Sequence, residues 1–252
     1  MKAETEITDE SAPEAAEPRS NYIVRFYQPG DRAVVRRICA DTGFLSNPID
    51  PLFEDRELFA DYLTRYYTDI EPESSLVCVV DGEIKGYLMG CRHHRRKAVF
   101  DFFHNIRLGV LGAWRYVFRP YNAASRRYVG WVLKQGRRET PVTPQNMPHF
   151  HINLLADARN IANSRGLIET FLRYLHENGE KSVYGQMVAF ENRRTERMFA
   201  RYGFRVIGQV EVTKYRGLFP GKVFLLTIVK DLDRNIGLYG LDLRKSVSHV
   251  ER

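Results

Sequence analysis

The sequence predicts a mixed α/β domain in which a single sheet carries helices on both faces. Three observations predict it: strand and helix patterns alternate along residues 22–232, Asp81 and Gly82 mark a tight hairpin turn, and residues 149–172 form a strand, a loop and a helix. The predicted order is β-α-α-β-β, a long insert, and then β-α-β-α-β-β. Ligands of such sheets bind where neighbouring strands part, so a binding site is expected at one of these strand ends.

Composition narrows the class of protein. With 252 residues, 44% of them hydrophobic, the chain can form one large globular domain. Its three dispersed cysteines disfavour a disulfide framework and favour a reducing, cytoplasmic compartment. No run of about 20 apolar residues occurs. The acidic N-terminus also lacks an apolar signal core, so neither a membrane span nor a secretory peptide is expected.

The formal net charge of +7 is concentrated in one segment. Residues 92–138 carry twelve Lys and Arg side chains against one acid, Asp101, whereas residues 1–20 carry six acids and two bases. An anionic partner is therefore expected to meet residues 92–138. Residues 1–20, rich in Glu, Ala, Pro and Ser, predict a disordered acidic leader, and residues 233–252 predict a polar tail.

The residues before the insert show the sequence patterns that are usual for strands and helices. β-branched and aromatic residues predict the first strand, a Pro-Gly-Asp turn opens the first helix, and apolar residues at helical spacing predict the second. The predicted elements are a strand over residues 22–27, helices over 32–42 and 55–69, and hairpin strands over 75–80 and 83–91.

Residues 92–148 are predicted to form a basic, aromatic insert with one or two helices, between the third and fourth strands. Its apolar side chains exceed what one core-facing stripe requires, which favours contact with a membrane interface or with a second copy of the chain. The alternatives are packing on the protein's own sheet, a substrate-binding lid, and nucleic-acid binding, which is the least favoured. The apolar residues concerned are Phe100, Phe102, Phe103, Ile106, Leu111, Trp114 and Phe118.

The central stretch is a buried strand over residues 149–155, a loop over 156–163, and a helix from Ser164 onward. Backbone N–H groups and the positive end of the helix dipole converge at the end of this loop, which suits an anionic phosphate. The elements that follow are strands over 182–190, 205–214 and 222–230, and a helix from Asn192 to a terminating Gly203.

This order, together with two motifs, resembles the GCN5-related N-acetyltransferase superfamily over residues 22–232. The family's pyrophosphate loop, Gln/Arg-x-x-Gly-x-Gly/Ala, corresponds to residues 159–164, with Ala162 and Ser164 in place of the glycines. The family's later helix, Asn-x-x-Ala-x-x-x-Tyr-x-x-x-Gly-Phe, corresponds to Asn192, Thr195, Phe199, Gly203 and Phe204.

The strand at residues 149–155 also resembles a bacterial subset, which includes domains linked to glycan metabolism and carries a His-x-His-Ile-Asp-Leu-Leu-like strand. Asn153 stands where that subset has an acid. The resemblance implies a mostly antiparallel sheet and an acetyltransferase domain over residues 21–232. It also implies acetyl-CoA as cofactor and direct acetyl transfer to an amine of a small molecule or glycan.

The resemblance assigns cofactor contacts residue by residue. Backbone N–H groups at Leu154 and Leu155 are expected to polarise the thioester carbonyl, as oxyanion donors do. The full set of expected contacts is Leu154, Leu155, Arg159, Asn160, Ile161, Ala162, Asn163, Ser164, Arg165, Asn192 and Phe199.

Three residues are the catalytic candidates: His151, Asn153 and Tyr215. Strand alternation places His151 and Asn153 on one face, and the ordinary pKa of imidazole suits a base or proton relay. The alternative is a structural histidine that hydrogen-bonds within the sheet. Tyr184 and Tyr202 compete with Tyr215 as the acid for the leaving thiolate, because Phe199 occupies the position where the family often has a tyrosine.

No metal site is predicted. The grouping of Cys91, His93 and His94 lacks a second Cys/His pair at suitable spacing. An alternative function is a fold with weakened catalysis that acts as a binding or scaffold module. It would work through the basic insert, at a polyanion or at the inner face of a membrane. Aminoacyl transfer from charged tRNA is a third possibility.

Overall fold

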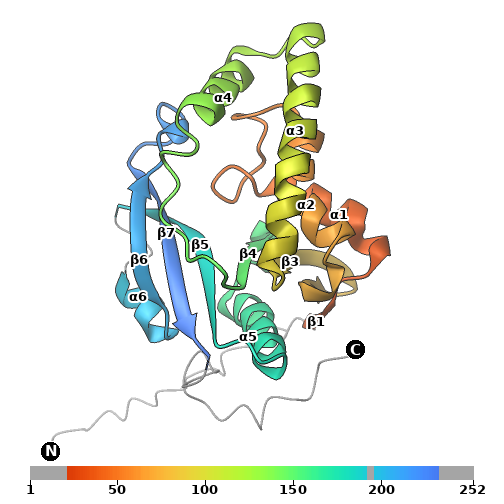
Figure 1. Ribbon diagram of the computed structural model, residues 1–252, viewed down its shortest axis with the longest axis vertical. Coiled ribbons are helices and arrows are strands. Elements are labelled where there is room, and N and C mark those ends of the chain that lie inside the picture. Colours follow the sequence, from red (N-terminus) through yellow and green to blue (C-terminus); the bar gives the residue numbers. More distant parts are fainter. Residues whose placement is uncertain (1–21, 192–195, 233–252) are drawn as a thin grey trace, which may run out of the picture.

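The computed structural model describes residues 22–191 and 196–232. Within these residues the chain forms one seven-stranded sheet in the order β1-β2-β3-β4-β5-β7-β6, flanked by helices (Figure 1). Every neighbouring pair is antiparallel except β4 and β5, which are parallel. The predicted mixed, mostly antiparallel fold is confirmed. The strands are β1 (Tyr22–Phe26), β2 (Ser75–Val80), β3 (Glu83–Cys91), β4 (His149–Leu154), β5 (Ser182–Phe190), β6 (Arg205–Glu211) and β7 (Val223–Asp231).

The turn between β2 and β3 confirms the predicted hairpin. Asp81 and Gly82 both have positive φ, 50° and 82°, as a two-residue hairpin turn requires. Glycine adopts this conformation freely and aspartate tolerates it, so the short connection fixes the pairing of the two strands.

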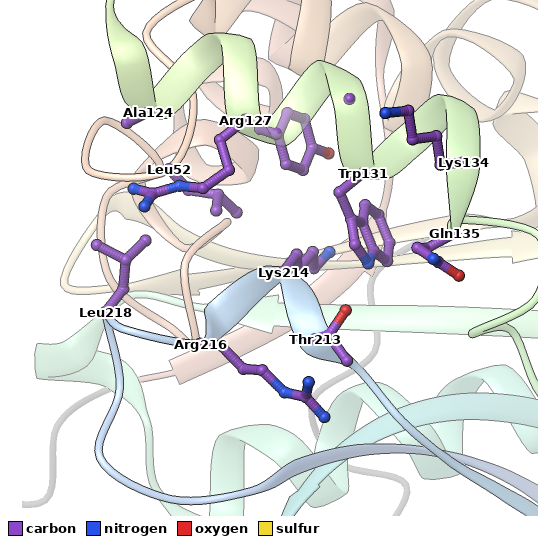
Figure 2. Close-up of a pocket in the computed structure, with 12 residues that line it drawn as sticks. Leu52, Ala124, Arg127, Trp131, Lys134, Gln135, Thr213, Lys214, Arg216 and Leu218 are labelled. Carbon is purple, nitrogen blue, oxygen red and sulfur yellow. The ribbon is translucent and has the colours of Figure 1, made fainter.

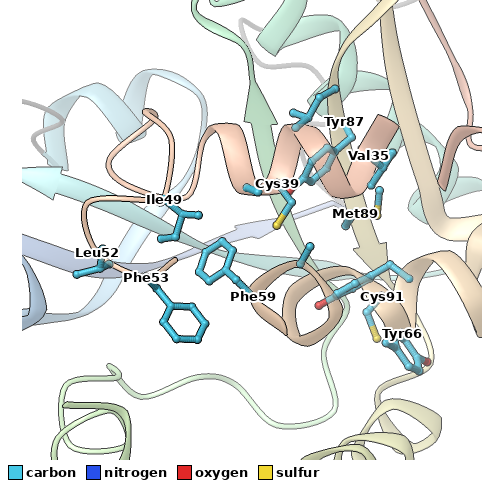
Figure 3. Close-up of a cluster of buried hydrophobic side chains, with 14 of the residues drawn as sticks. Val35, Cys39, Ile49, Leu52, Phe53, Phe59, Tyr66, Tyr87, Met89 and Cys91 are labelled. Atoms are coloured by element: carbon cyan, nitrogen blue, oxygen red, sulfur yellow. The ribbon is translucent and has the colours of Figure 1, made fainter. Parts of the chain in front are cut away.

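Two hydrophobic cores lie on opposite faces of the sheet, because neighbouring residues of a strand point to opposite sides. Val77, Tyr87 and Met89 face the first core, which contains α1 and α2 (Figure 3). Leu76 and Leu88 face the second core, which contains α5. The α-helices of the described residues are α1 (Arg32–Asp41), α2 (Arg56–Asp69), α3 (His94–Phe118), α4 (Ala123–Lys134), α5 (Ile161–Glu177) and α6 (Glu196–Arg201).

The segment over residues 92–148 forms two helices, α3 and α4, and α3 extends well past the sheet in Figure 1. Asp55 anchors this segment to the start of α2. Its buried carboxylate accepts hydrogen bonds from Arg115 at 2.7 and 2.8 Å and from the Tyr121 hydroxyl at 2.5 Å. It also caps α2 by accepting from the Leu58 N–H at 3.1 Å.

The alternative in which the apolar side chains of this segment pack on the protein's own sheet is wrong for most of them. Only His104 of α3 is buried, whereas Phe102, Phe103, Ile106, Trp114 and Phe118 are exposed. The helix instead rests on α2 through Phe100, His104 and Arg107. Among the described residues no helix is both long and apolar enough to cross a membrane.

Two element boundaries differ from the prediction by three residues, for physical reasons. The helix expected from Ser164 begins at Ile161, because the side chain of Asn160 accepts the N–H of Asn163 and caps the helix earlier. The strand expected over 205–214 ends at Glu211, and a 3₁₀ turn follows, η4 (Thr213–Tyr215).

Gly203, at φ 73°, follows α6 as predicted. The predicted cofactor contact at Asn192, the motif position Thr195, the leader over 1–20 and the tail over 233–252 lie outside the described residues.

Candidate functional site

The sheet opens between β4 and β5. β4 pairs with β3 along its whole length, but it pairs with β5 only at His149 and Phe150, opposite Tyr184 and Gly185. Beyond Phe150 the two parallel strands part. Backbone groups of β4 that point toward β5 therefore have no strand partner along the second half of β4.

Alternation decides which backbone groups of β4 face this opening. The N–H of Leu155 donates to the carbonyl of Lys85, beside β3, at 2.9 Å. The N–H and carbonyl of Leu154 therefore point the other way, toward the opening. The Leu154 carbonyl indeed accepts from the Arg159 guanidinium at 3.4 Å. This corrects the expectation for Leu155: its N–H already has an acceptor and is not free to polarise a thioester.

The N-terminus of α5 follows directly after β4. The Asn160 side chain accepts the N–H of Asn163 at 2.8 Å, and the Asn163 amide donates to the carbonyl of Ala158 at 2.8 Å. The N–H groups of Ile161 and Ala162 have no acceptor among the residues that the structure describes. Because both residues are exposed, the helix presents two free donors and its positive dipole end to solvent.

The Asn163 side chain is almost fully buried, at 1% exposed, yet its Oδ1 has no hydrogen-bond donor among the described residues. An acceptor without a partner at the base of a helix N-terminus is costly unless a ligand or water supplies a donor. Ser164 donates to the carbonyl of Asn160 at 2.8 Å, and Arg165 pairs with Glu169 one turn further along. Both are partly exposed.

Arg159 connects the end of β4 to the loop between α1 and α2. Its guanidinium donates to the carbonyl of Ser46 at 2.9 Å. Leu45 and Ser46 hold positive φ angles of 51° and 74°, so this loop turns sharply beside the opening. The cationic side chain that the motif predicted is therefore held over the end of β4.

The histidine face of β4 is directed toward α2. Tyr67 and His149 Nε2 are joined by a hydrogen bond of 3.0 Å. His151 packs edge-on against the rings of Tyr67 and Tyr87, with centroids 5.0 and 5.7 Å away, and its Nε2 is buried without a hydrogen-bond partner among the described residues. Asn153 donates to the Tyr87 hydroxyl at 2.7 Å.

Burial changes the acid–base chemistry of this face. Burial, together with the positive charge of Lys97, lowers the pKa of His149 to about 3 and the pKa of His151 to about 4. The expectation of an ordinary imidazole pKa at His151 is therefore wrong. His151 is neutral at pH 7, and its imidazole accepts a proton less readily than one in water.

A cavity of about 420 Å³ lies between α4 and the connection from β6 to β7 (Figure 2). Contacts of neighbouring residues place it near the strand ends. Phe219 packs at a tilt against Phe190, the last residue of β5, and Phe44 of the loop that holds Arg159 contacts Tyr215. The cavity is lined by Leu52, Ala124, Arg127, Tyr128, Gly130, Trp131, Lys134, Gln135, Thr213, Lys214, Arg216 and Leu218.

Lys214 is the chemically unusual group in this cavity. Its Nζ lies 5.0 Å from the ring centroids of Trp131 and Tyr215 and 5.9 Å from that of Tyr128. Among the described residues it has no hydrogen bond or ion pair. Burial lowers the pKa of Lys214 to about 8, although the carboxylate of Glu139 opposes this shift. Aromatic faces thus hold an amine that gives up its proton near neutral pH.

Tyr215 and Phe199, two predicted site residues, lie in different places. Tyr215 is buried next to Lys214, behind the cavity lining, and burial raises the pKa of Tyr215 well above the ordinary value, so its hydroxyl stays protonated. Phe199 is buried in the α5 core with Leu154 and Ala158. Among the described residues, no three His, Cys, Asp or Glu side chains gather as a metal ion would require.

Sequence reasoning missed the cavity residues Tyr128, Trp131 and Lys214. The alternation of basic and aromatic residues around Trp131 was a visible signal. Its contact with Lys214, more than 80 positions away, is set by tertiary packing that no local pattern encodes.

Comparison with known proteins finds solved structures that resemble this chain over most of its length. No protein-family model and no curated protein matches the chain. The crystal structure of SsHAT is 28% identical, with a TM-score of 0.60 over 84% of this chain and 98% of that one. The structure of yncA from Salmonella typhimurium, which contains acetyl-CoA, is 14% identical, with a TM-score of 0.49 over 87% and 99% of the two chains. A GCN5-related N-acetyltransferase from Kribbella flavida is 16% identical, with a TM-score of 0.48 over 83% and 97%.

β4 parts from β5 directly before the helix N-terminus at Ile161. The likeness to SsHAT extends over most of both chains and shows that this chain has the fold of that protein.

Proposed function

We propose that the protein is an acetyl-CoA-dependent N-acetyltransferase, with residues 21–232 as its catalytic domain, and that it transfers the acetyl group directly to a small-molecule amine. One observation carries the proposal: β4 and β5 part after Phe150, and the free end of β4 leads into the exposed N-terminus of α5. An extended thioester-bearing chain fits between parted strands, and its phosphates fit a helix N-terminus.

The residues at this N-terminus suit a pyrophosphate. The free N–H groups of Ile161 and Ala162 would donate to its oxygens, and the small side chains of Ala162 and Ser164 permit close approach. Because the Asn160 side chain already occupies the N–H of Asn163, that N–H is not among the proposed donors. The guanidinium of Arg159 adds a positive charge beside the Leu154 carbonyl.

When bound, acetyl-CoA would supply the activated acetyl group. The N–H of Leu154 points into the opening and would donate to the thioester carbonyl, which stabilises negative charge that develops there. The leaving thiolate has an ordinary pKa of about 8.5, so it departs without a strong acid. This fits the presence of Phe199 where many relatives have tyrosine.

The amine must lose its proton before it attacks. Lys214 shows what the cavity does to an amine: burial lowers its pKa to about 8. An acceptor amine held against Trp131 and Tyr128 would experience the same loss of water, so a substantial fraction would be neutral at pH 7.5. His151, neutral and with an unpartnered Nε2, is the proposed proton acceptor or relay, while Asn153 positions Tyr87 beside it.

The acceptor we infer is a small molecule or the amine of a glycan. The cavity of about 420 Å³ suits a small ligand, and the aromatic faces of Tyr128 and Trp131 suit a sugar or other ring. Four cationic side chains line it, Arg127, Lys134, Lys214 and Arg216, so a polyamine would be repelled. The three free, buried cysteines fit the reducing cytoplasm as the compartment.

A thiol-release assay with a panel of amines tests this proposal. The panel contains an amino sugar, an aromatic amine and a polyamine, each with acetyl-CoA and the full chain. We expect turnover of the amino sugar or the aromatic amine above that of the polyamine. Absence of turnover with every amine would favour the alternative, a binding module that retains the fold without the chemistry.

A further inference from the structure

An exposed apolar stripe runs along the outer face of α3. It consists of Val99, Phe103, Ile106, Val110, Trp114 and Val117, which recur every three or four residues and so share one side of the helix. We call this set the α3 stripe. Each side chain is more than half exposed, between 54% and 73%. Soluble domains rarely leave so continuous an apolar surface uncovered unless it binds something.

α3 attaches to the protein through a second face, which carries the rings of Phe100 and His104 as well as charges. Arg107 pairs with Asp61 at 2.7 Å and Arg115 pairs with Asp55 at 2.7 Å. These aromatic contacts and ion pairs hold α3 on the protein, while the apolar side chains of the α3 stripe remain outward. Folding does not require this arrangement, because an inward stripe would bury more apolar area.

The charges around the α3 stripe are positive. Arg95 and Arg96 lie four and seven residues before Val99 and Phe103, so helical spacing places them at the start of the same face. Among the described residues Arg95 has no ion pair, whereas Arg96 lies 3.9 Å from the carboxylate of Glu73. Asp101, the one acid of α3, lies on the other side and is paired with Lys97 at 2.6 Å.

We propose that the α3 stripe docks on an anionic membrane surface, with α3 lying in the plane of the interface. A helix of 25 residues is about 37 Å long. Trp and Phe side chains are favoured at the depth of lipid headgroups, and arginines beside them attract anionic lipids. A second copy of this chain fits less well, because it would bring another basic helix against the first without an acid to pair it. The inference does not depend on the proposed acetyl transfer.

Cosedimentation of the full chain with lipid vesicles tests this inference. One set of vesicles is pure phosphatidylcholine, and the other contains phosphatidylglycerol as roughly one third of its lipid. We expect binding to the anionic vesicles, and binding at least tenfold weaker to the neutral ones. Phe103→Ser with Trp114→Ser should weaken binding to anionic vesicles at least tenfold. The control, Val142→Ser, changes an apolar side chain outside α3 that is even more exposed, and should leave binding unchanged.

Three further measurements separate loss of membrane binding from unfolding and from dimer formation. Far-UV circular dichroism and the melting temperature of each variant should match the unmodified protein, because these side chains are exposed. In a Trp131→Phe background, the fluorescence of Trp114 should shift to shorter wavelength on anionic vesicles. Sedimentation velocity should show a monomer. No vesicle binding, binding that survives the double substitution, or a dimer that the double substitution dissociates would each overturn the proposal.

Discussion

The carboxylate of Glu139 accepts hydrogen bonds from both the backbone N–H and the hydroxyl of Thr213, each at 2.6 Å. The same carboxylate accepts from Trp131 Nε1 at 2.7 Å. One side chain thus ties α4 to the connection between β6 and β7 and closes the cavity that holds Lys214. Burial opposes ionisation, but the Thr213 hydrogen bonds hold the pKa of Glu139 below its ordinary value.

Removing the hydrogen bonds of Glu139 should weaken the packing around the cavity without disturbing the cofactor site. We expect Glu139→Ala to lower the free energy of unfolding by about 2 kcal/mol, because three donors lose their acceptor. The KM for the acceptor amine should rise several-fold, while the affinity for acetyl-CoA should stay constant. Glu211→Ala, which removes only the exposed pair with Arg216, is the control. Equal effects of the two substitutions would contradict the assignment.

The aromatic faces around Lys214 should control its ionisation. Trp131→Ala admits water to the ammonium, so the pKa of Lys214 should rise from about 8 toward its ordinary value of 10.5. Competitive labelling with acetic anhydride across a pH series, followed by mass spectrometry, measures this pKa. Val132→Ala changes an exposed neighbour on α4 and should leave it unchanged. If the pKa of Lys214 did not change in Trp131→Ala, the aromatic rings around Lys214 would not be what lowers it.

Stability should fall in mild acid because His151 must stay neutral in the folded state. Its pKa is about 4 when folded and near its ordinary value of 6.5 when unfolded, so between these values only the unfolded chain binds the proton. The free energy of unfolding therefore decreases as pH falls from about 6.5 to about 4, with a limiting slope of about 1.4 kcal/mol per pH unit for each such histidine. His149 acts in the same direction.

Urea unfolding at several pH values measures this slope. We expect His151→Gln to reduce the slope in this pH window, while the lowered pKa values of carboxylates such as Asp55 and Asp61 act only at lower pH. The same slope in the variant and in the unmodified protein would show that His151 is not held neutral by burial.

Among the charged residues that join the sheet domain to the 92–148 segment, Asp55 should contribute most to the free energy of unfolding. Asp55→Ala removes the acceptor of Arg115, Tyr121 and the α2 cap, and should lower the free energy of unfolding by about 3 kcal/mol. Asp50→Ala removes only an exposed pair with Arg56 and should cost about 0.5 kcal/mol or less. Chemical denaturation of both variants makes the comparison, and similar losses would contradict it.

Most of the fold could be predicted because the local signals agree with one another. The β2–β3 hairpin followed from Asp81 and Gly82, and the end of α6 followed from Gly203. The start of α5 was missed by three residues because a capping asparagine at position 160 outweighed the apolar spacing that begins after Ser164. These errors arise where side-chain hydrogen bonds, rather than periodicity, set a boundary.

The site was less predictable than the fold. The motif located the α5 N-terminus, since loop residues near a helix start are local in sequence. The pKa of His151 could not be read from the sequence, because it depends on burial against Tyr67 of α2 and Tyr87 of β3. The cavity around Lys214 requires α4 to fold back over η4, and no local pattern specifies that contact.

Titration calorimetry of the full chain with acetyl-CoA measures binding at the N-terminus of α5. We expect one bound molecule per chain with a dissociation constant below about 1 mM. Ala162→Glu should weaken binding at least tenfold, since its carboxylate would face the pyrophosphate while remaining favourable for the helix. Ala162→Gln, of similar size but neutral, should retain most of the affinity. No binding at millimolar acetyl-CoA, or equal binding by Ala162→Glu and the unmodified protein, would contradict the account.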